Sequence, residues 1–253
     1  QYAVEEAREA GIEQFIFVTG RGKSAIEDHF DVSYELQSTL GERKKTAELD
    51  MIHAMLPEPG QVAYIRQQEP LGLGHAIWCA RDIVGDEPFA ILLPDEFMHG
   101  KPGKGCLRQM VDAYEQTGGN LICALEVPME QTPSYGVLDP GGRDGALTEV
   151  KGLVEKPAPG TAPSNLIIAG RYILQPEVMQ HLSRHEKGAG GEIQLTDAMA
   201  AMIGNQPFFG VTFDGQRFDC GSKEGYVEAN LALALERDDI GAHIREFARK
   251  LVM

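Results

Sequence analysis

The sequence lacks the features that direct a chain into or across a membrane. No apolar run approaches the roughly 20 residues that a spanning helix requires, and no signal-peptide pattern is present. Cysteine is scarce as well, and no C-x-x-C pair occurs among Cys79, Cys106, Cys123 and Cys220. Thiols so few and so widely separated favour a cytoplasmic protein with reduced cysteines.

Basic residues are also in short supply. Lys and Arg total 23 against 38 Asp and Glu, which gives a formal net charge of −15. So acidic a chain is a poor general binder of nucleic acid or anionic membranes, because both are negatively charged. A phosphate-bearing ligand must therefore be held by a local cation, a metal ion or backbone amides.

The first half of the chain alternates strand and helix patterns. Strands are predicted at 15–18, 62–66, 89–93 and 121–126, and helices at 35–55, 73–84 and 107–116. This order is typical of α/β proteins. We expect a Rossmann-like mixed, mostly parallel central sheet with helices on both faces.

After Pro128 the pattern changes to strands at 135–139, 147–155 and 167–174, separated by turns rich in Pro and Gly. Helices resume at 176 and at 191–203, a hairpin is predicted from 208–213 and 216–219, and 224–252 is mostly helical. No linker composition is found. We therefore expect one domain over 1–253 with a β-rich part at 128–175.

The chain opens inside a helical pattern at 1–10, followed by the strand at 15–18. A helix followed by a strand is the second half of a βαβ unit, so another strand is expected ahead of Gln1. We expect the natural protein to be longer, and the 253 residues alone to fall short of a stable, active enzyme.

The segment FAILLPDEF combines a buried-strand pattern with two acidic residues. The apolar run at 89–93 suits a strand covered on both faces in the middle of a sheet, and Pro94 should end it. Asp95 then lies past the carboxyl end of that strand, where open α/β sheets bind ligands. Its carboxylate suits Mg²⁺, which takes one or two carboxylates with phosphate oxygens and water. The alternative is an acidic turn without a ligand.

The segment FDCGSKEGY repeats this arrangement, because an apolar residue is followed by Asp219 and a Gly turn into a helix. Asp219 is a candidate second metal ligand. The alternative is that its carboxylate caps the helix that begins at Ser222.

A glycine-rich turn, QQEPLGLGHA, lies between a predicted strand and a helix. Gly72 and Gly74 would let backbone amides approach a ligand, and the amide of Gln67 could read a donor and an acceptor on a base. A plain turn explains the glycines equally well. The nearby TGRGKS is no P-loop, because Phe17 stands where that motif requires glycine.

The segment VEKP places Glu155 and Lys156 on opposite sides of a strand, so only one can face a given cleft unless the chain bends at Pro157. Glu155 could accept hydrogen bonds from sugar hydroxyls, and Lys156 could neutralise a phosphate. The alternative is an exposed ion pair on an edge strand.

No Ser/His/Asp or Cys/His arrangement for covalent catalysis is suggested by the spacing. His29 and His75 lie in helical segments without a partner at ligand spacing. We expect both to be structural.

Eight segments together resemble one family, in its order and roughly its spacing. They are VTGRGKSAIEDHFD, RQQEPLGLGHA, LLPDEF, SYGVLD, VEKP, GRYIL, GGEIQLTDA and FDCGSKEGY. The chain is similar over nearly its whole length to the bacterial UTP–glucose-1-phosphate uridylyltransferases, which are sugar nucleotidyltransferases. The segments EIQLTDA and FDCGSKEGY resemble this uridylyl branch more than the thymidylyl branch.

The resemblance implies a role for each candidate residue. It implies that Gln67 recognises uracil and that Gly72 makes a backbone contact to the nucleoside. It implies that Asp95 and Asp219 bind Mg²⁺. It further implies that Gly136 and Glu155 contact glucose and that Lys156 binds the sugar phosphate. The sequence departs from the family at its front, where a G-x-G-T-R loop and a P-K-E-M-L-P stretch are expected and neither is found. That loop cradles the triphosphate in the family.

The implied reaction is attack by glucose 1-phosphate on the α-phosphorus of UTP, which gives UDP-glucose and pyrophosphate with Mg²⁺ as cofactor. We also expect a homo-oligomer, a dimer or tetramer, and, from the charge, no nucleic-acid or membrane partner. The alternatives are a glucose-1-phosphate thymidylyltransferase, a non-catalytic paralogue that binds nucleotide sugar, and a purely structural domain. Retention of Asp95, Lys156 and Asp219 argues against a non-catalytic paralogue.

Overall fold

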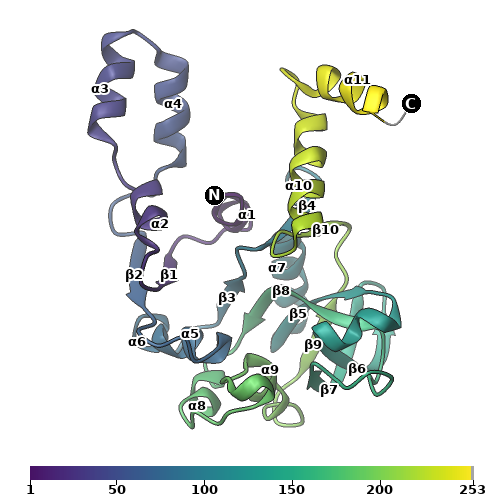
Figure 1. The fold of residues 1–253 in the computed structure, drawn as a ribbon. Coiled ribbons are helices and arrows are strands. Elements are labelled where there is room, and N and C mark those ends of the chain that lie inside the picture. Colours follow the sequence, from purple (N-terminus) through teal and green to yellow (C-terminus); the bar gives the residue numbers. More distant parts are fainter. Residues whose placement is uncertain (252–253) are drawn as a thin grey trace.

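The computed structural model describes residues 1–251, and a six-stranded sheet lies at its centre (Figure 1). Its strand order is β3–β8–β5–β9–β7–β6. The strands are β3 (Phe89–Leu92), β5 (Asn120–Glu126), β6 (Gly136–Asp144), β7 (Leu147–Glu155), β8 (Leu166–Leu174) and β9 (Phe208–Val211). All nine residues of β8 are buried, as expected for an interior strand covered on both faces.

The expected mixed α/β sheet is confirmed, but its pairings are not mostly parallel. Within the described residues, the pairing of β5 with β9 is the one parallel pairing of this sheet. Strand β8 lies between β3 and β5 and runs antiparallel to both, and β7 runs antiparallel to its neighbours β6 and β9. Strand β3 is also half-buried at the end of the strand order, although its apolar run predicted a place in the middle.

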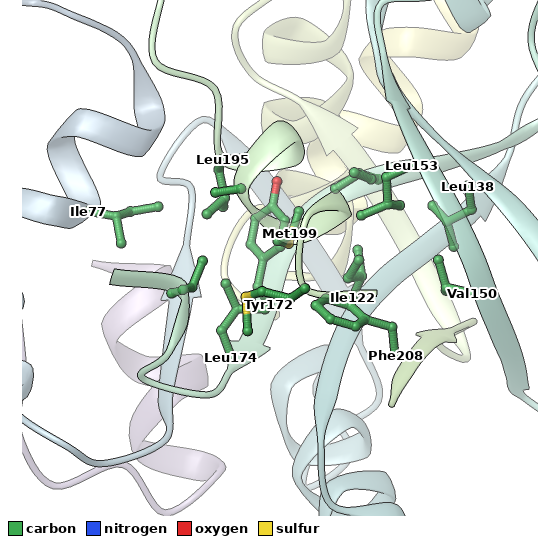
Figure 2. Packing of buried hydrophobic residues seen from close by; sticks show 14 of the residues in the cluster. Ile77, Ile122, Leu138, Val150, Leu153, Tyr172, Leu174, Leu195, Met199 and Phe208 are labelled. Atoms are coloured by element: carbon green, nitrogen blue, oxygen red, sulfur yellow. The ribbon is translucent and has the colours of Figure 1, made fainter. Parts of the chain in front are cut away.

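Helices cover both faces of the sheet, as expected, and enclose a core on each. One face packs against α5 (Leu73–Cys79), α8 (Val178–Leu182) and α9 (Leu195–Ala200), and the other against α1 (Tyr2–Glu9) and α7 (Cys106–Thr117). Successive residues of β5 alternate between the cores, because Ile122 belongs to the first and Leu121 to the second. Figure 2 shows the first core, where Tyr172 lies among apolar side chains that include Leu195 and Met199.

The sequence between α1 and α5 forms a separate lobe. Strands β1 (Phe15–Thr19) and β2 (Val62–Arg66) pair in parallel, and α2 (Ser24–His29), α3 (Tyr34–Glu42) and α4 (Thr46–Met55) connect them. Figure 1 shows α3 and α4 side by side, away from the six-stranded sheet. The sequence predicted one helix at 35–55, but the chain turns between α3 and α4, where Lys44 has a φ of +57°.

A third sheet places two distant segments side by side. Strand β4 (Glu96–Gly100) pairs antiparallel with β10 (Gly215–Asp219), and Asp219 lies opposite Glu96. The predicted hairpin of 208–213 with 216–219 is therefore wrong, because β9 pairs with β5 and β7 while β10 pairs with β4. Helices α10 (Lys223–Glu236) and α11 (Gly241–Leu251) follow β10.

The short elements are α6 (Arg81–Val84) and the 3₁₀ turns η1 (Met129–Ser134) and η2 (Ala189–Gly191). Among residues 1–251, no helix has both the length and the apolar character needed to cross a bilayer.

Candidate active site

Two carboxylates lie close together where β4 begins and β10 ends. Asp95 lies on the turn between β3 and β4, and Asp219 is the last residue of β10. The Cys220 amide donates to the Asp95 carbonyl at 2.7 Å. A Cβ atom added to Gly221 would lie 3.1 Å from Asp219 Oδ1 and 3.4 Å from Asp95 Oδ2, so both carboxylates border the same small space.

Asp219 does not cap the helix that follows it. The α10 cap is Ser222, whose hydroxyl oxygen accepts a hydrogen bond from the Gly225 amide at 3.0 Å. Asp219 Oδ1 instead accepts from the Gly221 amide, also at 3.0 Å. The capping alternative is therefore wrong, and Asp219 Oδ2 keeps lone pairs for a cation.

Glu155 and Lys156 lie on the same side of the chain. Strand β7 ends at Glu155, and Lys156 follows with a φ of +45°, a left-handed conformation that is uncommon for a residue with a side chain. This bend, one residue before the expected Pro157, brings Lys156 Nζ to 3.8 Å from Glu155 Oε1. Lys156 is half-exposed, so the ion pair itself contributes little, and its ammonium can reach a ligand.

Gly136 makes room beside the Glu155 carboxylate. The two residues are opposite each other in the β6–β7 ladder. A Cβ atom on Gly136 would lie 2.7 Å from Ile168 Cδ1, 3.0 Å from Glu155 Oε2 and 3.2 Å from Thr196 Oγ1. The Thr196 hydroxyl donates to Glu155 Oε2 at 2.6 Å and fixes the carboxylate. Sequence reasoning missed Thr196, although it lies inside the GGEIQLTDA segment.

Gln67 is held by two acceptors at the start of α5. Its Nε2 group donates to the Gly72 carbonyl and lies 3.0 Å from His75 Nδ1, which therefore accepts, so the His75 proton is on Nε2. His75 is buried and orients Gln67, in agreement with its expected structural role. The Gln67 Oε1 atom remains available to a ligand.

The glycines of this turn allow it to pack closely against residues 192–194. Gly72 has a φ of +111°, and a Cβ atom there would lie 2.8 Å from the Ile193 carbonyl oxygen. A Cβ atom on Gly74 would also lie 2.8 Å from that oxygen, which accepts from the Gly74 amide at 2.9 Å. The glycines are therefore required by close packing, but this packing is against the protein's own backbone and not against a ligand.

Arg217 is a second functional candidate that sequence reasoning missed. Its guanidinium binds both carboxylate oxygens of Glu96, lies 3.7 Å from Asp219 Oδ2 and sits 5.1 Å from the centre of the Tyr135 ring. Burial alone would lower the pKa of Arg217, but the hydrogen bonds and charge of Glu96 raise it. In sequence, Arg217 looks like any charged residue on a strand.

The buried Tyr172 of β8 is affected by the negative charge of several site carboxylates. Burial raises the pKa of its hydroxyl well above the usual value, and the charges of Glu155, Glu96 and Asp95 raise it further. Two sets of contacts connect the predicted site residues. Arg217 lies beside both Asp219 and Tyr135, the residue before Gly136, and residues 192–196 touch both Gly72 and Glu155.

Comparison with known proteins gives this region a context. The model of the family described as "Nucleotidyl transferase" matches residues 1–236. The chain belongs to the nucleotidyl transferase family.

Two curated relatives in this family are both named UTP–glucose-1-phosphate uridylyltransferase. The protein of Komagataeibacter xylinus is 55% identical over 223 residues, which cover 88% of this chain and 78% of the relative. That of Bacillus subtilis (strain 168) is 46% identical over 253 residues, which cover 100% of this chain and 85% of the relative. The resemblance found in the sequence is thereby confirmed.

Solved structures agree with this assignment. A UTP-bound UGPase from Acinetobacter baumannii superposes with a TM-score of 0.90 at 39% identity, over 99% of this chain and 87% of that one. A UDP-glucose pyrophosphorylase complexed with UDP-glucose gives 0.83 at 38% identity, over 93% and 86%. A glucose-1-phosphate thymidylyltransferase structure from Bacillus anthracis, at 18% identity and a TM-score of 0.66, shares the fold alone.

The close packing at Gly72 predicts that Gly72→Ala is more destabilising than Gly85→Ala. Both glycines have positive φ in a region that is nearly restricted to glycine, but nothing lies within 4 Å of a Cβ atom on Gly85. The difference isolates the clash with Ile193, which should cost a further 1–3 kcal/mol or so of unfolding free energy. Urea denaturation of both variants measures it, and equal losses would show that the turn tolerates a side chain.

Proposed function

We propose that the protein transfers the uridylyl group of UTP to α-D-glucose 1-phosphate, forming UDP-glucose and pyrophosphate. The observation that carries the proposal is the shared region formed by Asp95, Asp219, Glu155 and Lys156, in a chain 43–55% identical to named uridylyltransferases. The thymidylyl alternative has weaker support, since the thymidylyltransferase structure is 18% identical.

The nucleoside end of the site is assigned to the turn before α5. Gln67 presents Oε1 as an acceptor for the uracil N–H, and its two side-chain hydrogen bonds hold it in that orientation. Gly72 contributes backbone contacts to the nucleoside. Because Gly72 is locked against Ile193, this surface exists before the ligand binds.

The sugar end is assigned to the β-rich part at 128–175. Gly136 lets Glu155, Thr196 and Ile168 pack closely together, and Glu155 Oε1 is left to accept from a glucose hydroxyl, since Oε2 is already engaged by Thr196. Lys156 holds the sugar phosphate as a point charge. The positive φ of Lys156 directs its ammonium to the same side as the Glu155 carboxylate, so both can contact glucose 1-phosphate.

Asp95 and Asp219 are the residues that would hold Mg²⁺. Two carboxylates that border one small space provide the hard oxygen ligands that Mg²⁺ prefers, with room left for phosphate oxygens and water. A divalent cation bound there supplies positive charge to the phosphates and a template for their alignment. The described residues contain no group of three or more His, Cys, Asp or Glu side chains suited to a metal.

The chemistry needs no covalent intermediate. An anionic phosphate oxygen of glucose 1-phosphate attacks the α-phosphorus of UTP, the new P–O bond forms, and the bond to the bridging oxygen breaks as pyrophosphate leaves with the electron pair. The chain's contribution is to place the two substrates in line and to neutralise their charge. Glu155 holds the glucose and Lys156 its attacking phosphate, while Gln67 and Gly72 fix the nucleoside.

We also propose a single domain that acts as a homo-oligomer in the cytoplasm. The four cysteines of the described chain are free, as suits a reducing compartment. Exposed apolar side chains on α10 and α11, such as Val227 and Phe247, would be buried by contact between copies.

The proposed function is tested by pyrophosphate release from glucose 1-phosphate with UTP or dTTP in the presence of Mg²⁺. We expect UDP-glucose as the product and a clear preference for UTP. Equal or greater kcat/KM with dTTP would favour the thymidylyl alternative. Binding of UDP-glucose without turnover would favour the non-catalytic one.

We expect Lys156→Ala to weaken the use of glucose 1-phosphate far more than the use of UTP. Loss of a charge-assisted contact costs about 1.5–3 kcal/mol, which lowers kcat/KM for glucose 1-phosphate by on the order of ten- to a hundredfold. Lys151→Ala, at an exposed lysine of the strand β7 that ends just before Lys156, is the control. A defect limited to the KM for UTP would place Lys156 at the nucleotide instead.

A further inference from the structure

The turn that carries Asp95 is held to the neighbouring strand β8 by hydrogen bonds from Arg171. This arginine of β8 donates from Nη1 to the Leu93 carbonyl at 2.9 Å and from Nη2 to the Glu96 carbonyl at 2.8 Å. Its two hydrogen bonds therefore bracket Asp95 on both sides. Asp95 itself is exposed, so burial contributes little to fixing its carboxylate.

The preceding residue, Gly170, completes this attachment. Its carbonyl accepts from the Leu93 amide at 2.9 Å, so Leu93 is held through both its N–H and its C=O groups. Gly170 has a φ of +63°, and a Cβ atom there would lie 2.5 Å from Glu96 Cγ. The Glu96 side chain can pass over this glycine to reach Arg217, which lies 3.7 Å from Asp219.

Arg171 is in turn fixed by Glu6 of α1. The side chain of Arg171 is 1% exposed and that of Glu6 is 8% exposed, and Arg171 Nη2 lies 2.8 Å from Glu6 Oε2. Glu6 Oε1 also accepts from the Leu107 amide in the first turn of α7 at 3.0 Å. The two buried charges are thus paired and hydrogen-bonded, which is the condition for keeping them away from water.

A fork-shaped donor is required for this arrangement. The planar guanidinium reaches the Glu6 carboxylate through Nε and Nη2 and the two backbone carbonyls through Nη1 and Nη2. A lysine ammonium is a compact charge on a flexible stem and cannot span these acceptors in one fixed geometry.

We propose that Arg171, locked by Glu6, is a positioning residue that fixes the Asp95 carboxylate for the divalent cation. The proposal rests on the proposed metal role of Asp95 and Asp219. It makes the cation affinity depend on a buried ion pair that touches neither the cation nor the substrates. Helix α1, far along the chain from Asp95, thereby becomes part of the support for the metal site.

The test uses Arg171→Lys and measures Mn²⁺ binding from the electron paramagnetic resonance signal of free Mn²⁺, with UDP-glucose present and a protein-free blank. Outer partners of metal ligands typically contribute about 10–100-fold to metal affinity, so we expect a loss of about tenfold or more. The Mg²⁺ concentration for half-maximal UDP-glucose synthesis should rise in parallel, with the KM for glucose 1-phosphate at saturating Mg²⁺ nearly unchanged. Arg237→Lys, in an exposed pair with Asp239, is the control.

A second variant separates positioning from folding. Glu6→Met with Arg171→Met removes both charges together, which leaves no unpaired buried charge, and such replacements are often tolerated. We expect this double variant to fold cooperatively and to show the same loss of Mn²⁺ affinity as Arg171→Lys. This variant decides the matter if Arg171→Lys fails to fold.

Asp95→Asn in the same Mn²⁺ titration separates this inference from the proposed function. If Asp95→Asn weakens Mn²⁺ binding while both Arg171 variants bind it normally, the positioning role is wrong and the metal assignment stands. If Asp95→Asn binds Mn²⁺ normally, the metal assignment is wrong and the inference falls with it. A lower melting temperature in the Arg171 variants without a change in Mn²⁺ affinity would show a purely structural ion pair.

Discussion

The antiparallel pairing of β4 with β10 is the constraint on which the site depends. It joins a strand from the first half of the chain to one from the second half, in a register that sets Asp219 opposite Glu96. Asp95 and Asp219 can border one space only because of this register. A slip of one residue would turn the side chains of β10 to the other face of the ladder.

The negative net charge of the chain means that a phosphate ligand must be attracted by individual positive groups at the site. The chain carries a net charge of −15, so the protein as a whole repels phosphates, and attraction must come from local groups. Arg171 and Arg217 are already neutralised by Glu6 and Glu96 and act through the positions of other groups. Lys156, which is half-exposed, is a side-chain cation that can reach a substrate phosphate.

Sequence reasoning succeeded where a local signal exists. Pro94 marks the end of a strand because proline cannot donate to the ladder, and β3 indeed ends just before it, which places Asp95 on a turn. It failed where the answer depends on contacts between distant segments. The pairing of β10 with β4 cannot be seen in the Asp214–Gly215 turn that suggested a hairpin with β9. The insertion of β8 between β3 and β5, which adds two antiparallel pairings, leaves no local signal either.

The same limit applies to single residues. The left-handed conformation of Lys156 is unusual for a lysine, so the shared orientation of Glu155 and Lys156 could not be read from alternation along the strand. The buried charge of Arg171 has a clear purpose only when Glu6 and the Asp95 turn are seen beside it. The glycines at 72 and 74 were recognised, but their close contact with Ile193 was not.

The most direct test of the account is a double-mutant cycle with Asp95→Asn, Asp219→Asn and the two combined, measured as the rate of UDP-glucose synthesis at limiting Mg²⁺. If both carboxylates hold the same cation, each single variant loses most of its activity. The double variant then loses clearly less than the sum of the two free-energy changes, with a coupling of about 0.5–3 kcal/mol. Near-normal rates for either single variant, or strictly additive losses, would show that Asp95 and Asp219 do not act on one cation.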